Sequence, residues 1–214
     1  MTELLLVPSP LLGPAAWAPV ADLLGARVAD PAGATTPEEV VAAVVAAAAG
    51  MRDLVLVPHS NAGLYAPLLA ERLGARATVY VDAALAGAGS DTALAPPRFL
   101  EILEGLADDD GLLPPWTQWW DDVSELFPDE ASRALVEAGQ PRLPLSYFTA
   151  RVAVPAAWAE RPCGYLAFGD TYADEVAFAL AQGWPLTVLA GQHLHPLVAP
   201  ADVAAAIEEL ATRA

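Results

Sequence analysis

The chain has 214 residues, a length that suits one domain with a sizeable core. Its hydrophobic fraction of 55% is high, but charged residues and prolines interrupt every apolar run before it could cross a membrane. The 10 Lys and Arg residues are outnumbered by 27 Asp and Glu residues, and the net charge of −17 argues against nucleic-acid and membrane partners, because both are anionic.

The N-terminal part alternates short apolar runs with longer segments of helical period. The first run, in MTELLLVPSP, follows an acid rather than basic residues and is too short for a secretory signal, so we expect a cytoplasmic protein. The pattern predicts strands at 3–8, 26–30, 53–58 and 77–82, and helices at 15–25, 36–50 and 61–74. Thr36 and Glu39 have the spacing of a capping box, and Gly50 marks the end of that helix.

Residues 91–160, called the inserted segment below, break this alternation with prolines, acids and tryptophans. We interpret the segment as a few short helices inserted between strands, over the carboxyl edge of the sheet, where ligands bind. Its acids, crowded between 108 and 130, indicate a solvated surface, with attraction of a cationic substrate as the alternative. Its aromatic residues either line a substrate pocket or only pack the segment onto the domain: Trp116, Trp119, Trp120, Phe127, Tyr147 and Phe148.

Regular alternation resumes at Cys163, with predicted strands at 163–169 and 186–191 and predicted helices at 171–183 and 200–213. Cys163 is the only cysteine, which excludes a disulfide within the chain and a cysteine-rich metal site. Strands and helices that alternate in this way form βαβ units. We therefore predict one α/β domain over 1–214, with a mostly parallel sheet of about six strands flanked by helices.

The stretch LVLVPHSNAG carries the main chemical signal. A serine at a strand-to-helix turn projects its hydroxyl above the sheet only if the backbone is strained, and strain of this kind requires small neighbours. Ser60 is therefore a candidate nucleophile, and a plain N-cap is the alternative. Pro58 and Ala62 stand where the pattern G-x-S-x-G has glycines, while Asn61 begins a helix whose N–H groups could hold an oxyanion.

A serine nucleophile needs a base, and the chain has three histidines. His59 is adjacent to Ser60 and is expected to stack behind the turn, because adjacent side chains there point apart. His193 follows the last predicted strand, at the same edge of the sheet as Ser60, and is the candidate base. His195 is assigned a supporting or packing role.

These residues resemble the α/β-hydrolase superfamily, and the resemblance covers nearly the whole chain. LLLVPSPLLGPAAWAPVADLLGARVADP is similar to the family's first strand, oxyanion turn and helix, LVLVPHSNAG to its nucleophile elbow, and GQHLHPLVAPADVAAAI to its histidine loop and final helix. The order Ser, acid, His is also the family's order. The resemblance implies an α/β-hydrolase fold in which the inserted segment, at about 91–160, is a helical cap.

The resemblance also implies roles for single residues. Ser60 would be the nucleophile and His193 the base, and the acid stays open between Asp82, which ends the fourth strand, and Asp170, in the loop after the strand at 163–169. The N–H of Asn61 would form half of the oxyanion hole. The other half comes from the turn Pro8-Ser9-Pro10-Leu11, where proline cannot donate, so the Leu11 N–H or the Ser9 hydroxyl would have to serve.

The function expected from these residues is that of a serine hydrolase, of the esterase or thioesterase type, acting on a small to medium neutral acyl substrate. No metal and no organic cofactor is implied. The alternatives are a ligand-binding or scaffold protein that keeps the fold without hydrolysis, and a lyase or cyclase that uses Ser60 and His193 for proton transfer. A small molecule is the expected partner, and a homodimer is left open beside a monomer.

Overall fold

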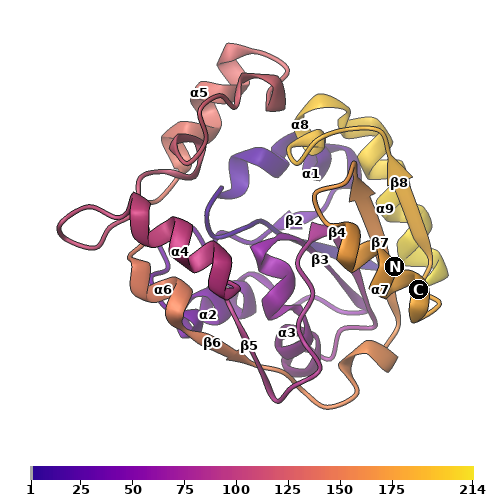
Figure 1. Ribbon diagram of the computed structural model, residues 1–214. Helices are drawn as coiled ribbons and strands as arrows, with labels where there is room; N and C mark the ends of the chain where they lie inside the picture. Colours follow the sequence, from indigo (N-terminus) through magenta and orange to yellow (C-terminus); the bar gives the residue numbers. More distant parts are fainter. Residues whose placement is uncertain (1) are drawn as a thin grey trace.

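A six-stranded parallel sheet forms the centre of the computed structural model, which describes residues 2–214 (Figure 1). Its strand order is β2-β1-β3-β4-β7-β8. The chain thus starts inside the sheet, runs to one edge, returns to β3 and then builds toward the other edge, and such a reversal is where α/β sheets bind ligands. The predicted parallel sheet is confirmed, with strands β1 (Glu3–Val7), β2 (Arg27–Val28), β3 (Leu54–Ser60), β4 (Ala77–Ala83), β7 (Cys163–Phe168) and β8 (Leu186–Leu189).

Helices cover both faces of the sheet. On one face α1 (Ala18–Leu24) contacts α9 (Pro200–Arg213), and on the other α2 (Pro37–Ala47) contacts α3 (Ala66–Leu73), with α7 (Ala173–Ala181) against β7 and β8 (Figure 1). Within residues 2–214, no helix combines the length and the apolar character needed to cross a membrane.

Two of the predicted helices begin with a 3-10 turn. The helix expected at 15–25 starts as η1 (Pro14–Trp17) and that expected at 61–74 as η2 (Asn61–Tyr65). In both cases the α-helix that follows has proline in its first turn, at Pro19 and Pro67, and proline lacks the N–H that would extend the helix backward. A short helix, α8 (His195–Val198), was not predicted.

The start of α2 follows the capping-box prediction. Thr36 Oγ1 accepts a hydrogen bond from the Glu39 N–H at 3.3 Å, and Glu39 Oε2 accepts one from the Thr36 N–H at 3.3 Å. Two N–H groups that the helix leaves without partners are satisfied in this way. The helix ends at Ala47, before the predicted Gly50, which has a positive φ of 80°.

The core lies on both faces of the sheet because strand side chains alternate. In β4, Val79 and Val81 belong to the cluster that contains Ile207 of α9. Tyr80, on the opposite face, stacks on Trp184 with ring centres 5.6 Å apart. Val79, Tyr80 and Val81 are all buried, so the end of β4 is held rigidly from both sides.

The inserted segment contains the short helices that were predicted and an antiparallel ribbon that was not. The ribbon pairs β5 (Asp91–Ala93) with β6 (Arg151–Ala153), and so joins the two ends of the segment. Each strand has three residues, too few to show a period of two in the sequence. The helices are α4 (Pro97–Leu106), η3 (Trp116–Gln118), η4 (Ser124–Leu126), α5 (Glu130–Gly139), α6 (Leu145–Thr149) and η5 (Trp158–Glu160).

Candidate active site

The turn after β3 holds Ser60 in a strained conformation. Its backbone has φ 58° and ψ −131°, a region that residues with a side chain rarely adopt. The pairing of β3 with β4 also shifts register between His59 and Ser60. The Ser60 side chain makes no capping hydrogen bond to η2, and it lines the main cavity instead. The N-cap alternative therefore does not describe this serine.

The small residue that the turn requires is Gly63. A Cβ placed on Gly63 would lie 2.1 Å from the Ala84 carbonyl oxygen, which is impossibly close, and 3.0 Å from the Ala83 Cβ, which is tight. Pro58 lies within β3 and is paired with Val7 of β1, so the strand accommodates a proline at this position. The close approach of η2 to the end of β4 thus depends on a glycine one residue beyond the G-x-S-x-G pattern.

The histidine loop places His193 against the end of β4. His193 Nδ1 and Asp82 Oδ2 are 2.6 Å apart, and Asp82 Oδ1 accepts a hydrogen bond from the Phe168 N–H at 3.0 Å. Asp82 is fully buried, so these two contacts fix its carboxylate. A carboxylate on Nδ1 keeps the proton there and leaves Nε2 free to accept a proton. Asp170 is exposed and forms no hydrogen bond to any described residue, so the structure brings Asp82 and not Asp170 to the histidine.

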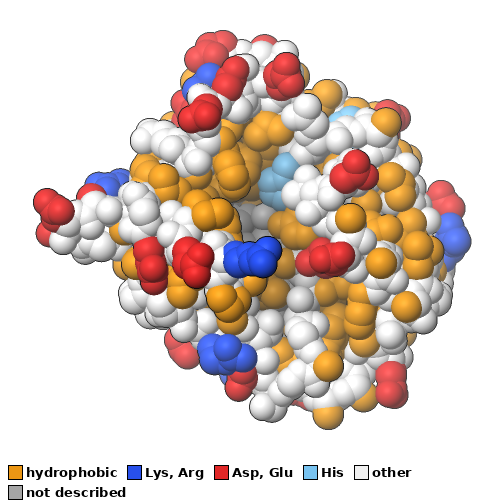
Figure 2. Space-filling model, in the orientation of Figure 1, with side chains coloured by type: hydrophobic (Ala, Val, Ile, Leu, Met, Phe, Trp, Pro, Cys, Tyr) orange, Lys and Arg blue, Asp and Glu red, His pale blue; other side chains and the backbone are white. Residues whose placement is uncertain are grey.

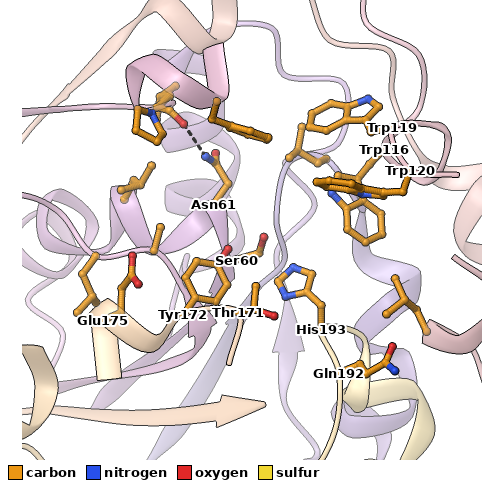
Figure 3. A pocket seen from close by; sticks show the side chains of 18 of the residues that line it. Ser60, Asn61, Trp116, Trp119, Trp120, Thr171, Tyr172, Glu175, Gln192 and His193 are labelled. Atoms are coloured by element: carbon orange, nitrogen blue, oxygen red, sulfur yellow. Dashed lines mark hydrogen bonds between the residues drawn. The ribbon is translucent and has the colours of Figure 1, made fainter. Parts of the chain in front are cut away.

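Ser60 and His193 line the same cavity and lie near one another (Figure 3). No hydrogen bond joins their side chains within the part of the chain that the structure describes. Hydrogen bonds of this kind often tighten only in the substrate complex.

Tyr172, a residue that the sequence analysis did not single out, lies beside Ser60 in this cavity (Figure 3). Burial raises the pKa of Tyr172, and the neighbouring Ser60 hydroxyl opposes that rise. The phenol therefore keeps its proton at neutral pH and can donate a hydrogen bond into the cavity. Its position just before α7 made it part of a predicted helix, and nothing in the sequence marks it as a site residue.

His59 lies behind the turn and supports the histidine loop. It is fully buried, and its Nε2–H donates a hydrogen bond to the His193 carbonyl oxygen at 3.1 Å. The two imidazole rings are stacked, 4.6 Å apart, and Trp17 meets His59 edge-on at 5.4 Å. Burial and the nearby His193 lower the pKa of His59 well below its usual value, so His59 is neutral. His195 packs on Phe168, with ring centres 5.2 Å apart.

Two of the three expected oxyanion donors line the cavity and the third does not. Asn61 begins η2 and lines the cavity, as does Leu11. Ser9 is fully buried and outside the lining, and its Oγ accepts a hydrogen bond from the Leu11 N–H at 3.4 Å. The structure therefore does not bring Ser9 to the cavity wall, and its hydroxyl oxygen contacts the backbone of its own turn.

The side chain of Asn61 ties the turn to the inserted segment. Its amide nitrogen donates to the Leu94 carbonyl oxygen at 3.1 Å, and its oxygen accepts from the Tyr147 hydroxyl at 3.0 Å. Tyr147 in turn accepts from the Tyr65 hydroxyl at 2.8 Å. Tyr147 and Phe148 are buried in the core and do not line the cavity, so their expected pocket role is wrong. The packing alternative describes them, since the Tyr147 hydroxyl is satisfied within the chain.

The cavity above Ser60 has a volume of about 1050 Å³ and a mostly hydrophobic wall (Figures 2 and 3). This size accommodates a small to medium organic molecule. The inserted segment contributes aromatic side chains to the wall: Phe99, Trp116, Trp119 and Trp120. Among residues 2–214, no cluster of three or more His, Cys, Asp or Glu side chains is arranged to hold a metal ion.

Comparisons with known proteins give similarity in structure only. No family model matches the chain, and no curated protein matches it. An extracellular α/β-hydrolase from a Paenibacillus species superposes with a TM-score of 0.78 at 16% identity, over 98% of this chain and 99% of that one. Polyneuridine aldehyde esterase gives 0.73 at 13% identity, over 98% and 99%. A pyrethroid hydrolase from Sphingobium faniae gives 0.71 at 19% identity, over 99% and 98%.

Proposed function

We propose that this chain, which has the α/β-hydrolase fold, is a serine hydrolase that acts on ester bonds of a small to medium neutral acyl substrate. The observation that carries the proposal is the hydrogen-bonded Asp82–His193 pair, whose histidine lines the same cavity as a serine held on a strained turn. The structural neighbours named as an esterase and as a pyrethroid hydrolase support hydrolysis as the class of reaction.

In this proposal His193 Nε2 accepts the proton of the Ser60 hydroxyl while Ser60 Oγ bonds to the ester carbonyl carbon. The carbonyl oxygen takes the negative charge, and the tetrahedral intermediate then breaks the bond to the alcohol, which leaves with the proton from His193. Water repeats the two steps on the acyl-enzyme and releases the acid. Asp82 stays ionised throughout and holds the imidazole in the required tautomer.

The oxyanion is assigned to the backbone N–H groups of Asn61 and Leu11. Asn61 stands at the start of η2, where N–H groups have no partner within the helix. The Leu11 N–H is held only by a 3.4 Å contact to Ser9 Oγ, which is long for a hydrogen bond, so a charged oxygen would compete for it readily.

A lyase or cyclase that uses Ser60 and His193 for proton transfer is the second candidate. Pro10 favours it, because this residue removes an N–H donor from the turn whose Leu11 lines the same cavity as Ser60. A reaction without a tetrahedral intermediate depends less on that donor.

Hydrolysis of p-nitrophenyl butyrate by three variants tests the proposal. Ser60→Ala should abolish turnover, and Asp82→Asn should lower kcat by about 10³- to 10⁴-fold, because the histidine loses its preferred tautomer. Asp170→Asn should keep nearly the wild-type rate, since this side chain is exposed and apart from His193. A larger loss for Asp170→Asn than for Asp82→Asn would assign the acid to the other loop. Turnover that survives Ser60→Ala would remove the hydrolase proposal.

A further inference from the structure

The charges that line the cavity are all of one sign. Asp122, Glu125 and Glu175 contribute carboxylates, and within residues 2–214 no arginine belongs to the lining. Arg98 comes nearest along the chain, next to the lining residue Phe99, but is not part of the wall. The whole chain adds to this field with its net charge of −17. A low-dielectric cavity with walls of one sign concentrates ligands of the opposite sign.

Glu175 differs from the other two carboxylates. It lies in the first turn of α7, half-buried, and reaches the cavity beside Tyr172 (Figure 3). No hydrogen bond or ion pair joins its carboxylate to another residue of the described chain. Asp122 is exposed and already accepts a hydrogen bond from the Ser124 N–H at 2.8 Å, and Glu125 is exposed. A partly desolvated carboxylate without a partner gains most from a cation supplied by a ligand.

Aromatic rings face the same space. Trp116 and Trp120 are arranged edge to face, with ring centres 6.5 Å apart and planes at 73°. Trp120 is 46% exposed, so part of its indole ring is open to a ligand. An indole face attracts a cation that lies within about 6 Å of its centre, and alkylated ammonium groups are bound in this way. The same rings also accept the uncharged part of a substrate.

We propose that Glu175 is a specificity-determining residue that makes the cavity prefer esters with a positively charged group, such as an alkylammonium alcohol, over uncharged esters of the same shape. The inference rests on the proposed hydrolase function and names its substrate class. The charged group of the alcohol lies at the Glu175 carboxylate, and the neutral acyl part lies toward the tryptophan wall on the other side of Ser60 (Figure 3). Anionic compounds are disfavoured by the same charges.

Two esters of the same shape test the preference: butyrylcholine, which has a quaternary nitrogen, and 3,3-dimethylbutyl butyrate, which has carbon in its place. The wild-type protein should show kcat/KM about tenfold higher for the cationic ester, the size expected of a partly desolvated cation site. Glu175→Gln should bring the ratio of the two values close to one. The matched control is Glu101→Gln, which removes one exposed carboxylate on α4, outside the cavity wall.

The control should keep the wild-type ratio. A wild-type ratio near one, or an equal fall in both variants, would overturn the inference, because the preference would then be absent or due to net charge alone.

A binding measurement separates failure of this inference from failure of the hydrolase proposal. Choline and 3,3-dimethylbutanol are titrated into the wild type, Ser60→Ala and Glu175→Gln, with tryptophan fluorescence as the signal. Tighter binding of choline that Glu175→Gln abolishes, in a protein that hydrolyses neither ester, would retain the cation preference and remove only the hydrolase function. Ester turnover together with equal binding of the two alcohols would remove the cation preference and retain the hydrolase function.

Discussion

Two of the four non-glycine residues with a positive φ in the described chain lie where β3 and β4 end. Ser60 has a φ of 58° and Asp82 a φ of 39°, although neither is a glycine, and both are buried. Each such residue costs on the order of 1–3 kcal/mol and persists only where its surroundings hold it. Both side chains reach the carboxyl edge of the sheet, where His193 contacts Asp82 and lies near Ser60 in the cavity wall (Figure 3). The strained backbone thus lowers the stability of the fold at the two residues to which we assign the chemistry.

His59 makes the stability of the protein depend on pH. Burial, and then His193, lower the pKa of His59, so the folded protein keeps it neutral while the unfolded chain protonates it below about pH 6.5. The free energy of unfolding should therefore fall as the pH drops below about 6.5, by up to about 1 kcal/mol per pH unit for this one group. His59→Gln, which keeps a side-chain N–H for the His193 carbonyl, should show a weaker fall.

Urea unfolding of both proteins at about pH 7.5 and about pH 5.5, on either side of the ordinary histidine pKa, measures this difference. The titrating groups that His59 does not contact are shared and cancel in the comparison. An equal loss of stability in the two proteins would contradict a neutral His59 in the folded state.

At the scale of elements, the contact between η2 and the end of β4 positions the serine. Gly63→Ala should lower the free energy of unfolding by about 1–3 kcal/mol, because its Cβ would overlap the Ala84 carbonyl oxygen unless η2 moves away from β4. Gly105→Ala in α4 is the control, since nothing lies within 4 Å of a Cβ there and alanine favours a helix. Denaturant unfolding checks both variants. A Gly63→Ala protein as stable as the control would show that η2 does not need this close approach.

The sheet elements were predictable because buried parallel strands are continuous apolar runs. The ribbon of β5 and β6 was missed, since its three-residue strands leave no periodic pattern. The aromatic residues of the inserted segment divided into two groups that sequence could not separate. Trp116, Trp119 and Trp120 line the cavity, whereas Tyr147 and Phe148 are held in the core by contacts such as the hydrogen bond to Asn61, which depend on tertiary structure.

At the scale of the whole molecule, residues far apart in sequence meet because parallel strands end at one edge. Asp82 and His193 are 111 residues apart and come into contact by this rule, which from sequence placed His193 at the same edge as Ser60. The family resemblance left the acid open between Asp82 and Asp170, and the strands that precede these two positions, β4 and β7, are neighbours in the sheet. Only the path of the histidine loop decides between the two carboxylates. Tyr172 and Glu175 were not predictable, since their position depends on where α7 begins.

The measurement that tests the account most directly is labelling with a fluorophosphonate probe, read by peptide mass spectrometry. This probe forms a covalent bond only with a serine that a base has activated. We predict an adduct on Ser60 in the wild type, and none in Ser60→Ala or His193→Ala. A folded wild-type protein that forms no adduct, or an adduct that survives His193→Ala, would contradict the assignment of Ser60 as a nucleophile activated by His193.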